Sequence, residues 1–131
     1  SFPTRRSSDL ELITDSSYTI NIIEFEQKIV NEQLYIQYKN SNNEKDGLGL
    51  CFQMLLSSNI DLIKFSIAKI RDFLVKLEEK TFSENKYEDE CNPKLIKFLF
   101  ELMFKNVNDF CLLSNICFIL NKISSFLCKM N

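Results

Sequence analysis

The chain has 131 residues, enough for one domain, and is 45% hydrophobic and 26% charged, a composition typical of a folded protein rather than a disordered one. Two glycines and two prolines are too few for the tight turns of a β-sandwich or a βαβ fold, so the composition favours an all-α protein. The net charge of −2 gives no support for nucleic-acid binding, and the lack of histidine excludes Ser-His and Cys-His nucleophile pairs.

The sequence contains no motif typical of an enzyme. It has no Gly-rich phosphate loop and no G-x-S-x-G, and its only carboxylate cluster, Glu88 to Glu90, falls in a polar stretch where a solvated loop is expected rather than a metal site. The five cysteines include no C-x-x-C pair, and four of them fall in apolar helical patterns, which predicts buried, reduced thiols in an intracellular protein. We therefore expect no enzymatic activity, metal, cofactor or small-molecule substrate.

The first ten residues are set apart from the predicted fold. Their sequence, SFPTRRSSDL, resembles the in-frame translation of a DNA-sequencing adaptor, and a disordered native tail is the alternative. Because an adaptor would be joined directly to Glu11, we expect the natural N-terminus to be missing.

The stretch 11–46 is expected to be a helical extension that precedes the main fold. Good helix formers and apolar residues at helical spacing predict one helix from about Ile20 to Tyr38. Apolar residues also alternate on both sides of this run, so a β-hairpin with a turn near Asn31 is the alternative, although no glycine or proline supports that turn. The residues that carry the helical spacing are Ile22, Phe25 and Ile29.

Two helices are predicted in the middle of the chain. The polar run 41–47 predicts a loop, and a short helix is expected over 48–56. The clearest amphipathic pattern then predicts a helix over 61–79, after a polar break that offers an N-cap. Its apolar face is made of Ile63, Ile67, Ile70, Leu74 and Leu77.

The last third of the chain predicts a second pair of helices. The acidic run 80–91 indicates a linker or a distorted short helix, and Asn92 followed by Pro93 predicts a helix start with Asn as the N-cap. Asparagines at 106–108 end that helix, and a long helix from about 110 to 128 follows.

This long helix is apolar almost all round, so we expect other helices to sandwich it. Its length of about 19 residues would suit a membrane span, but Lys122 near mid-span and several Asn and Ser favour burial in a soluble fold. The face expected in the core consists of Leu113, Ile116, Leu120, Ile123 and Leu127, widened by Phe110, Cys117, Phe118 and Phe126.

The helix pairs 48–79 and 92–128 follow one plan: a short helix, a polar break containing Asn, and a longer helix. The break SSNIDL in the first pair corresponds to KNVNDF in the second, about 48 positions later. This period is close to that of HEAT and armadillo repeats, with 80–91 as an insertion. We predict that residues 47–131 form about two repeats of a right-handed α-solenoid, ending in a cut face with an exposed apolar patch that makes the isolated chain self-associate.

Three stretches of the chain resemble importin-alpha, the armadillo-repeat adaptor of nuclear import. The stretch SIAKIRDFLVKLEE (66–79) is similar to the long helix of that family's first repeat, and NPKLIKFL (92–99) to the start of the next repeat's middle helix. CFILNKISS (117–125) resembles the family's third helix, in which a Trp and an Asn four residues later face the peptide groove.

The resemblance implies a peptide-binding face that includes Ser114, Phe118 and Lys122. Phe118 takes the position of the family's Trp and can offer a weak cation-π face, whereas Lys122 takes the position of the Asn and would repel a basic cargo. The alternative is that Phe118 belongs to the core and Lys122 is a solvated charge.

By this resemblance, the chain is expected to be an adaptor that recognises nuclear localisation signals. The partners would be a cargo protein with a basic signal and, as a further candidate, importin-beta, with no nucleic acid and no membrane, and the protein would occur in cytoplasm and nucleus. The alternative function is a general armadillo or HEAT scaffold with a different protein partner.

Overall fold

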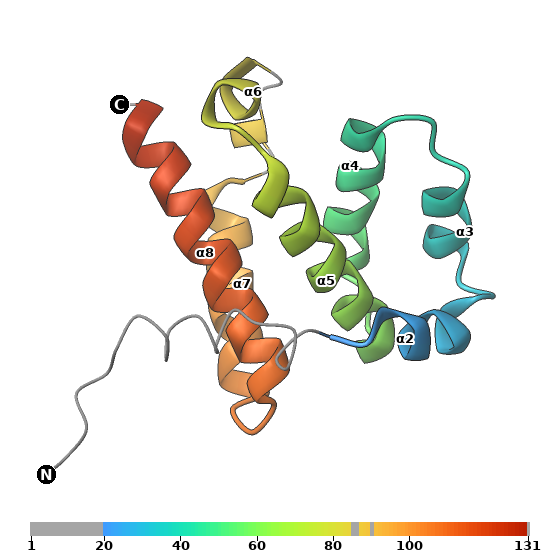
Figure 1. The fold of residues 1–131 in the computed structure, drawn as a ribbon. Helices are drawn as coiled ribbons and strands as arrows, with labels where there is room; N and C mark the ends of the chain where they lie inside the picture. The colour runs from blue at the N-terminus through green and yellow to red at the C-terminus, as the bar shows by residue number, and fades with distance from the viewer. Residues whose placement is uncertain (1–19, 85–86, 90, 131) are drawn as a thin grey trace, which may run out of the picture.

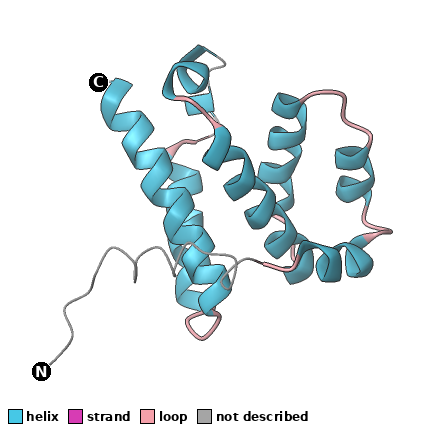
Figure 2. Ribbon diagram, viewed as in Figure 1, coloured by secondary structure: helices cyan, strands magenta, loops and turns pink. Residues whose placement is uncertain are grey.

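The computed structural model describes residues 20–84, 87–89 and 91–130. Within these ranges the regular structure consists of helices and no strand, so the predicted all-α class is confirmed (Figures 1 and 2). The expected tail at 1–10 and the part of the N-terminal extension at 11–19 lie outside the described residues.

The helix predicted over 20–38 is wrong in one respect, because the chain forms two helices there. These are α2 (Ile22–Ile29) and α3 (Gln33–Lys39), and Glu32 between them is extended with ψ of 130°. Ile29 and Tyr35 are both buried, although six residues on one straight helix would point their side chains about 120° apart. The turn near Asn31 exists, but it joins two helices and not the two strands of a hairpin.

The loop predicted over 41–47 is too long. Helix α4 (Glu44–Met54) begins inside it, because the Asn43 side chain accepts a hydrogen bond from the Asp46 amide at 2.8 Å and caps the helix. Gly47 therefore lies within the helix and is buried, and a Cβ there would lie 3.4 Å from the Tyr38 ring. The lack of a side chain at Gly47 lets α3 and α4 approach closely.

Helix α5 (Ile60–Lys76) forms the centre of the fold. Asn59 caps its start, and the helix ends three residues before the predicted end because Leu77 is extended with ψ of 129°. It packs against α2, α4 and α8, and it lies between α4 and α8 in Figure 1. Of the predicted apolar face, Ile63, Ile67, Ile70 and Leu74 are buried and Leu77 is half-buried.

The acidic stretch 80–91 is the distorted short helix of the prediction and not a linker. It contains α6 (Glu79–Glu84) and the short 3-10 helix η2 (Tyr87–Asp89). Phe82 and Tyr87 are buried, and the Phe82 ring stacks on the Phe126 ring with 4.8 Å between centroids. Phe82, Tyr87 and Cys91 are thus part of the core.

Helix α7 (Pro93–Lys105) begins as predicted. The Asn92 side chain accepts a hydrogen bond from the Leu95 amide at 3.1 Å, and Pro93 occupies the first turn. Helix α8 (Phe110–Met130) follows after the turn 106–109, and the two helices pack against each other.

The predicted sandwiching of α8 holds for only part of the helix: it packs against α5, α6 and α7, but one side is uncovered. Phe110 is 72% exposed and Cys117 is also exposed. In the described part of the chain α8 is the one helix long and apolar enough to span a membrane, and 33% of its most apolar window is buried within the fold. The buried face is also turned relative to the prediction: Leu113, Leu120 and Leu127 are half-buried, and the core positions are Leu112, Ile116, Ile119, Ile123 and Phe126.

Candidate functional site

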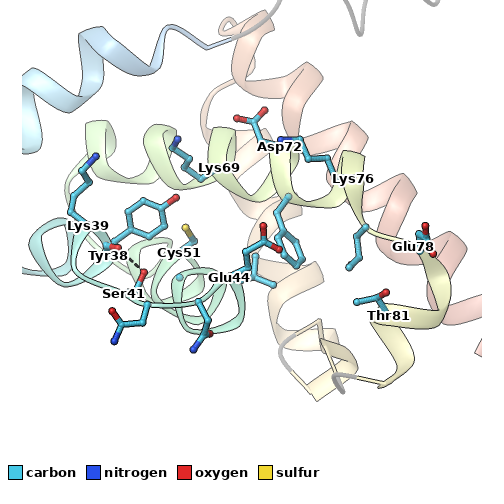
Figure 3. A pocket seen from close by; sticks show the side chains of 16 residues that line it. Tyr38, Lys39, Ser41, Glu44, Cys51, Lys69, Asp72, Lys76, Glu78 and Thr81 are labelled. Atoms are coloured by element: carbon cyan, nitrogen blue, oxygen red, sulfur yellow. Dashed lines mark hydrogen bonds between the residues drawn. The ribbon is translucent and has the colours of Figure 1, made fainter.

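An open groove of about 780 Å³ lies between α5 and the α3–α4 region (Figure 3). We call it the α3–α5 groove. Its charged residues are balanced, with three lysines and three carboxylates, and its floor contains apolar side chains. The lining residues are Tyr38, Lys39, Ser41, Asn42, Asn43, Glu44, Gly47, Leu48, Cys51, Lys69, Asp72, Phe73, Lys76, Leu77, Glu78 and Thr81.

One wall of the groove is formed by α5. Lys69, Asp72 and Lys76 follow at spacings of three and four, so their side chains lie along one side of the helix. Lys69 is half-buried, with its Nζ 5.6 Å from the centroid of the Phe65 ring, whereas Asp72 and Lys76 are exposed. This wall therefore presents a positive, a negative and a positive group in sequence.

The opposite wall comes from α3, the following loop and the start of α4. The Tyr38 side chain extends from α3 toward Lys69 on α5 (Figure 3) and packs edge-on against Phe65 with 5.7 Å between centroids. Ser41 donates a hydrogen bond to the Tyr38 carbonyl at 2.7 Å, which fixes the loop against the end of α3. Because Gly47 has no side chain, the Tyr38 ring packs close to the α4 backbone at this wall.

Tyr38 and Cys51 stay protonated at neutral pH. Burial, together with the neighbouring Cys51, Asp72 and Glu26, raises the pKa of Tyr38 to about 12. Burial also raises the pKa of the Cys51 thiol to about 12, against a smaller opposing effect of Lys69. Since the thiolate is the reactive form of cysteine, Cys51 is not an activated nucleophile, and Tyr38 offers a neutral hydroxyl for hydrogen bonding.

The residues predicted from the family resemblance lie elsewhere, on α8. Ser114, Phe118 and Lys122 follow at intervals of four on one side of the helix, and all three are half-buried. We call this side the α8 ledge. The structure thus brings the three predicted residues to one surface, and none of them lines the α3–α5 groove.

A cation of the chain itself covers the Phe118 ring. The Arg71 guanidinium carbon, from α5, lies 5.1 Å from the centroid of that ring, and the Arg71 guanidinium donates a hydrogen bond to the Asn115 side chain at 3.3 Å. Lys122 places its Nζ 5.4 Å from the centroid of the Phe126 ring. Arg71 therefore occupies a face of the Phe118 ring that could otherwise receive a lysine side chain of a ligand.

Sequence reasoning missed the groove. The charges at Lys69, Asp72 and Lys76 could have been found, because they repeat at helical spacing off the apolar face of their helix. Tyr38 and the loop after it show no such pattern. They lie beside α5 because α4 packs against both α3 and α5.

The described residues contain no group of three or more His, Cys, Asp or Glu side chains placed to hold a metal ion. Comparison with protein-family models, with curated proteins and with solved structures finds no match.

Proposed function

We propose that the chain is a protein-interaction module that holds an extended peptide segment in the α3–α5 groove. The observation that carries this proposal is the groove itself, with about 780 Å³ of open space along the central helix. In the same proposal, α4–α5 and α7–α8 are two units of an armadillo- or HEAT-like solenoid, which is consistent with α5, the long helix of the first pair, packing on α8, the long helix of the second.

The lining of the groove suits a peptide better than a small molecule. Small-molecule sites are mostly apolar and enclosed, with a few polar groups. Here the wall on α5 alternates in charge at Lys69, Asp72 and Lys76, above an apolar floor that includes Leu48 and Phe73. An extended peptide can place side chains of both signs against that wall and an apolar side chain on the floor.

The narrower proposal is an adaptor for nuclear localisation signals, acting through the α8 ledge in cytoplasm and nucleus with importin-beta as a second partner. One observation favours it: Ser114, Phe118 and Lys122 share one side of α8, and none of them is buried. Arg71 and Lys122 weigh against it, because their positive charges, which lie over the Phe118 and Phe126 rings respectively, would repel a lysine-rich peptide. We therefore prefer the groove and the general scaffold.

The test is a selection of random peptides displayed on phage, followed by fluorescence anisotropy of the recovered peptides. Wild type is compared with the double variant Lys69→Glu, Lys76→Glu, in which the groove wall is reversed in charge. The control is Lys28→Glu, Lys129→Glu, which makes the same change of net charge at exposed positions of α2 and α8. We expect the groove variant to bind about tenfold more weakly and the control to bind as wild type does.

Loss of binding in the control instead, or equal binding in all three proteins, would contradict the groove proposal. A lysine-rich localisation peptide measured in the same assay tests the narrower proposal. Binding that Phe118→Ala weakens would support it, and a lack of binding would count against it.

A further inference from the structure

Helix α7 carries an apolar surface that the rest of the described chain leaves open. Its core face includes Leu99 and Leu102, both buried, and packs on α8. A second apolar face lies roughly 120° further round the helix. We call it the α7 outer stripe; its members are Ile96, half-exposed, Phe100 at 47% exposure, Phe104 at 77% and Val107 at 56%.

The stripe has the geometry of one side of a helix–helix contact. Ile96, Phe100 and Phe104 are spaced by four, so they form a line about 12 Å long on one face of α7, and Val107 follows in the turn after Lys105. Phe110, 72% exposed at the first position of α8, lines the same shallow hollow as Val107. Single exposed apolar residues are common on protein surfaces, but a line with two phenylalanines is typical of a surface that is covered in an assembly.

A row of charges borders the stripe. Lys97, Glu101 and Lys105 are all exposed, follow at intervals of four, and lie on the solvent side of the stripe. No ion pair joins any of the three to another described residue. The edge therefore presents a positive, a negative and a positive charge over two helical turns, about 12 Å, and the exposed Lys94, three residues before Lys97, adds a further positive charge at its N-terminal end.

We propose that the α7 outer stripe binds an amphipathic helix of a partner protein, and that the partner carries Glu, Lys and Glu at intervals of four along the edge of its own apolar stripe. A helix with this pattern would place each charge against its opposite on α7 while its apolar face covers Phe100 and Phe104. This surface is distinct from the α3–α5 groove, so the proposal does not depend on the groove.

The charge row favours such a partner over the other occupants of an apolar face. A second copy docked antiparallel in register would place Lys97 against Lys105 and Glu101 against Glu101, so that all these charges would repel. Shifted by one helical turn, it would pair Lys97 with Glu101 on both sides but leave both copies of Lys105 without an acidic partner, close to Lys94 of the other copy. An anionic membrane would attract the lysines but repel Glu101, which lies midway along the row. A helix of opposite pattern satisfies all three positions.

The test uses two synthetic helical peptides of about 18 residues, labelled with fluorescein. Both carry the same leucine stripe; one has Glu-Lys-Glu along its edge and the other Lys-Glu-Lys. Fluorescence anisotropy is measured with the wild-type chain and with the triple variant Lys97→Glu, Glu101→Lys, Lys105→Glu, whose charge row is exchanged. We expect wild type to prefer the Glu-Lys-Glu peptide by about tenfold and the triple variant to prefer the other peptide by a similar factor.

A second pair of variants tests the apolar part of the contact. Phe100→Ser with Phe104→Ser should weaken binding of the preferred peptide by at least about tenfold. Leu56→Ser, which alters a residue 76% exposed in the turn between α4 and α5, is the matched control and should bind as wild type does. Circular dichroism of each variant establishes that the fold is retained.

Three results would overturn the proposal. The first is equal affinity of wild type for the two peptides, or a preference that the triple variant does not reverse. The second is a wild-type dimer in light scattering that Phe104→Ser converts to a monomer, because a second copy would then occupy the stripe. The third is binding to vesicles of phosphatidylserine and phosphatidylcholine that the same substitution abolishes, because the occupant would then be a membrane surface.

Discussion

Lys64 Nζ lies 2.8 Å from Asp109 Oδ2, and this ion pair joins α5 to the start of α8. The other oxygen of Asp109 accepts a hydrogen bond from the Leu112 amide at 3.0 Å and so caps α8. Partial burial alone would raise the pKa of Asp109, but the hydrogen bonds from Lys64 and Leu112 and the charge of Lys64 outweigh it and hold the pKa below its usual value. One carboxylate thus fixes the second helix pair to the first.

Substitution of Asp109 by Asn removes this charge but keeps a side chain that can cap the helix. We expect Asp109→Asn to lower the free energy of unfolding near neutral pH by about 1 kcal/mol. Because the folded pKa is depressed, the stabilisation is present above the unfolded pKa of about 3.9 and is lost as the pH falls through the lower folded value. Urea unfolding of both proteins at several pH values measures this. A difference that does not shrink as the pH falls below about 3.9 would contradict the assignment.

Asn115 supports the buried Arg71 side chain. It is 1% exposed, accepts from Arg71 at 3.3 Å and donates to the Cys111 carbonyl at 2.6 Å. Removal of this acceptor leaves part of a buried guanidinium without its hydrogen bond, so Asn115→Ala should lower the free energy of unfolding by about 2 kcal/mol. The control is Asn121→Ala at an exposed position of the same helix, which should change stability by less than about 0.5 kcal/mol. Chemical denaturation of both variants measures the two changes in the free energy of unfolding, and equal changes would contradict the role of Asn115.

Phe82 tests whether the acidic stretch belongs to the core. Its ring is fully buried and stacks on Phe126, so Phe82→Ala should cost about 3 kcal/mol or more. Phe104→Ala changes the same residue type at a position 77% exposed and should leave the isolated chain nearly as stable as wild type. Equal midpoints in thermal unfolding for the two variants would show that α6 is only loosely attached.

The two glycines of α4 should respond differently to alanine. Nothing lies within 4 Å of a Cβ built at Gly49, so Gly49→Ala should stabilise the protein by about 0.5–1 kcal/mol through helix propensity. At Gly47 a Cβ would lie 3.4 Å from both the Tyr38 ring and the Ser41 hydroxyl, so the gain there should be smaller or reversed. Differential scanning calorimetry of the two variants compares these effects; a larger gain at Gly47 would refute the close approach of α3.

Features set by neighbouring residues could be predicted from the sequence. Asn92 and Pro93 define the start of α7 because the cap is a local hydrogen bond, and the face of α5 follows from its spacing of apolar residues. The break in 20–38 could not be predicted in this way. Its helix formers are continuous, and the turn is fixed by the burial of both Ile29 and Tyr35 against the rest of the fold.

Features that depend on distant partners were missed. The acidic composition of 80–91 suggested a solvated segment, so the burial of Phe82 was not predicted. That burial depends on contact with Phe126, which lies near the other end of the chain. The α8 ledge was predicted from spacing within one helix, but its electrostatics depend on Arg71, which comes from another helix. The two walls of the α3–α5 groove belong to different helices, so only the row of charges on α5 could be recognised in the sequence.

The central claim is that the α3–α5 groove receives an extended peptide, and its most direct test is an NMR titration. The uniformly labelled chain is titrated with a peptide from the phage selection, and the backbone amide shifts are mapped. We predict that the shifts concentrate at the groove walls, around Tyr38, Ser41, Lys69 and Lys76, with little change in α7. Saturable binding with shifts confined to α7 and the turn 106–109, or to the α8 ledge, would contradict it.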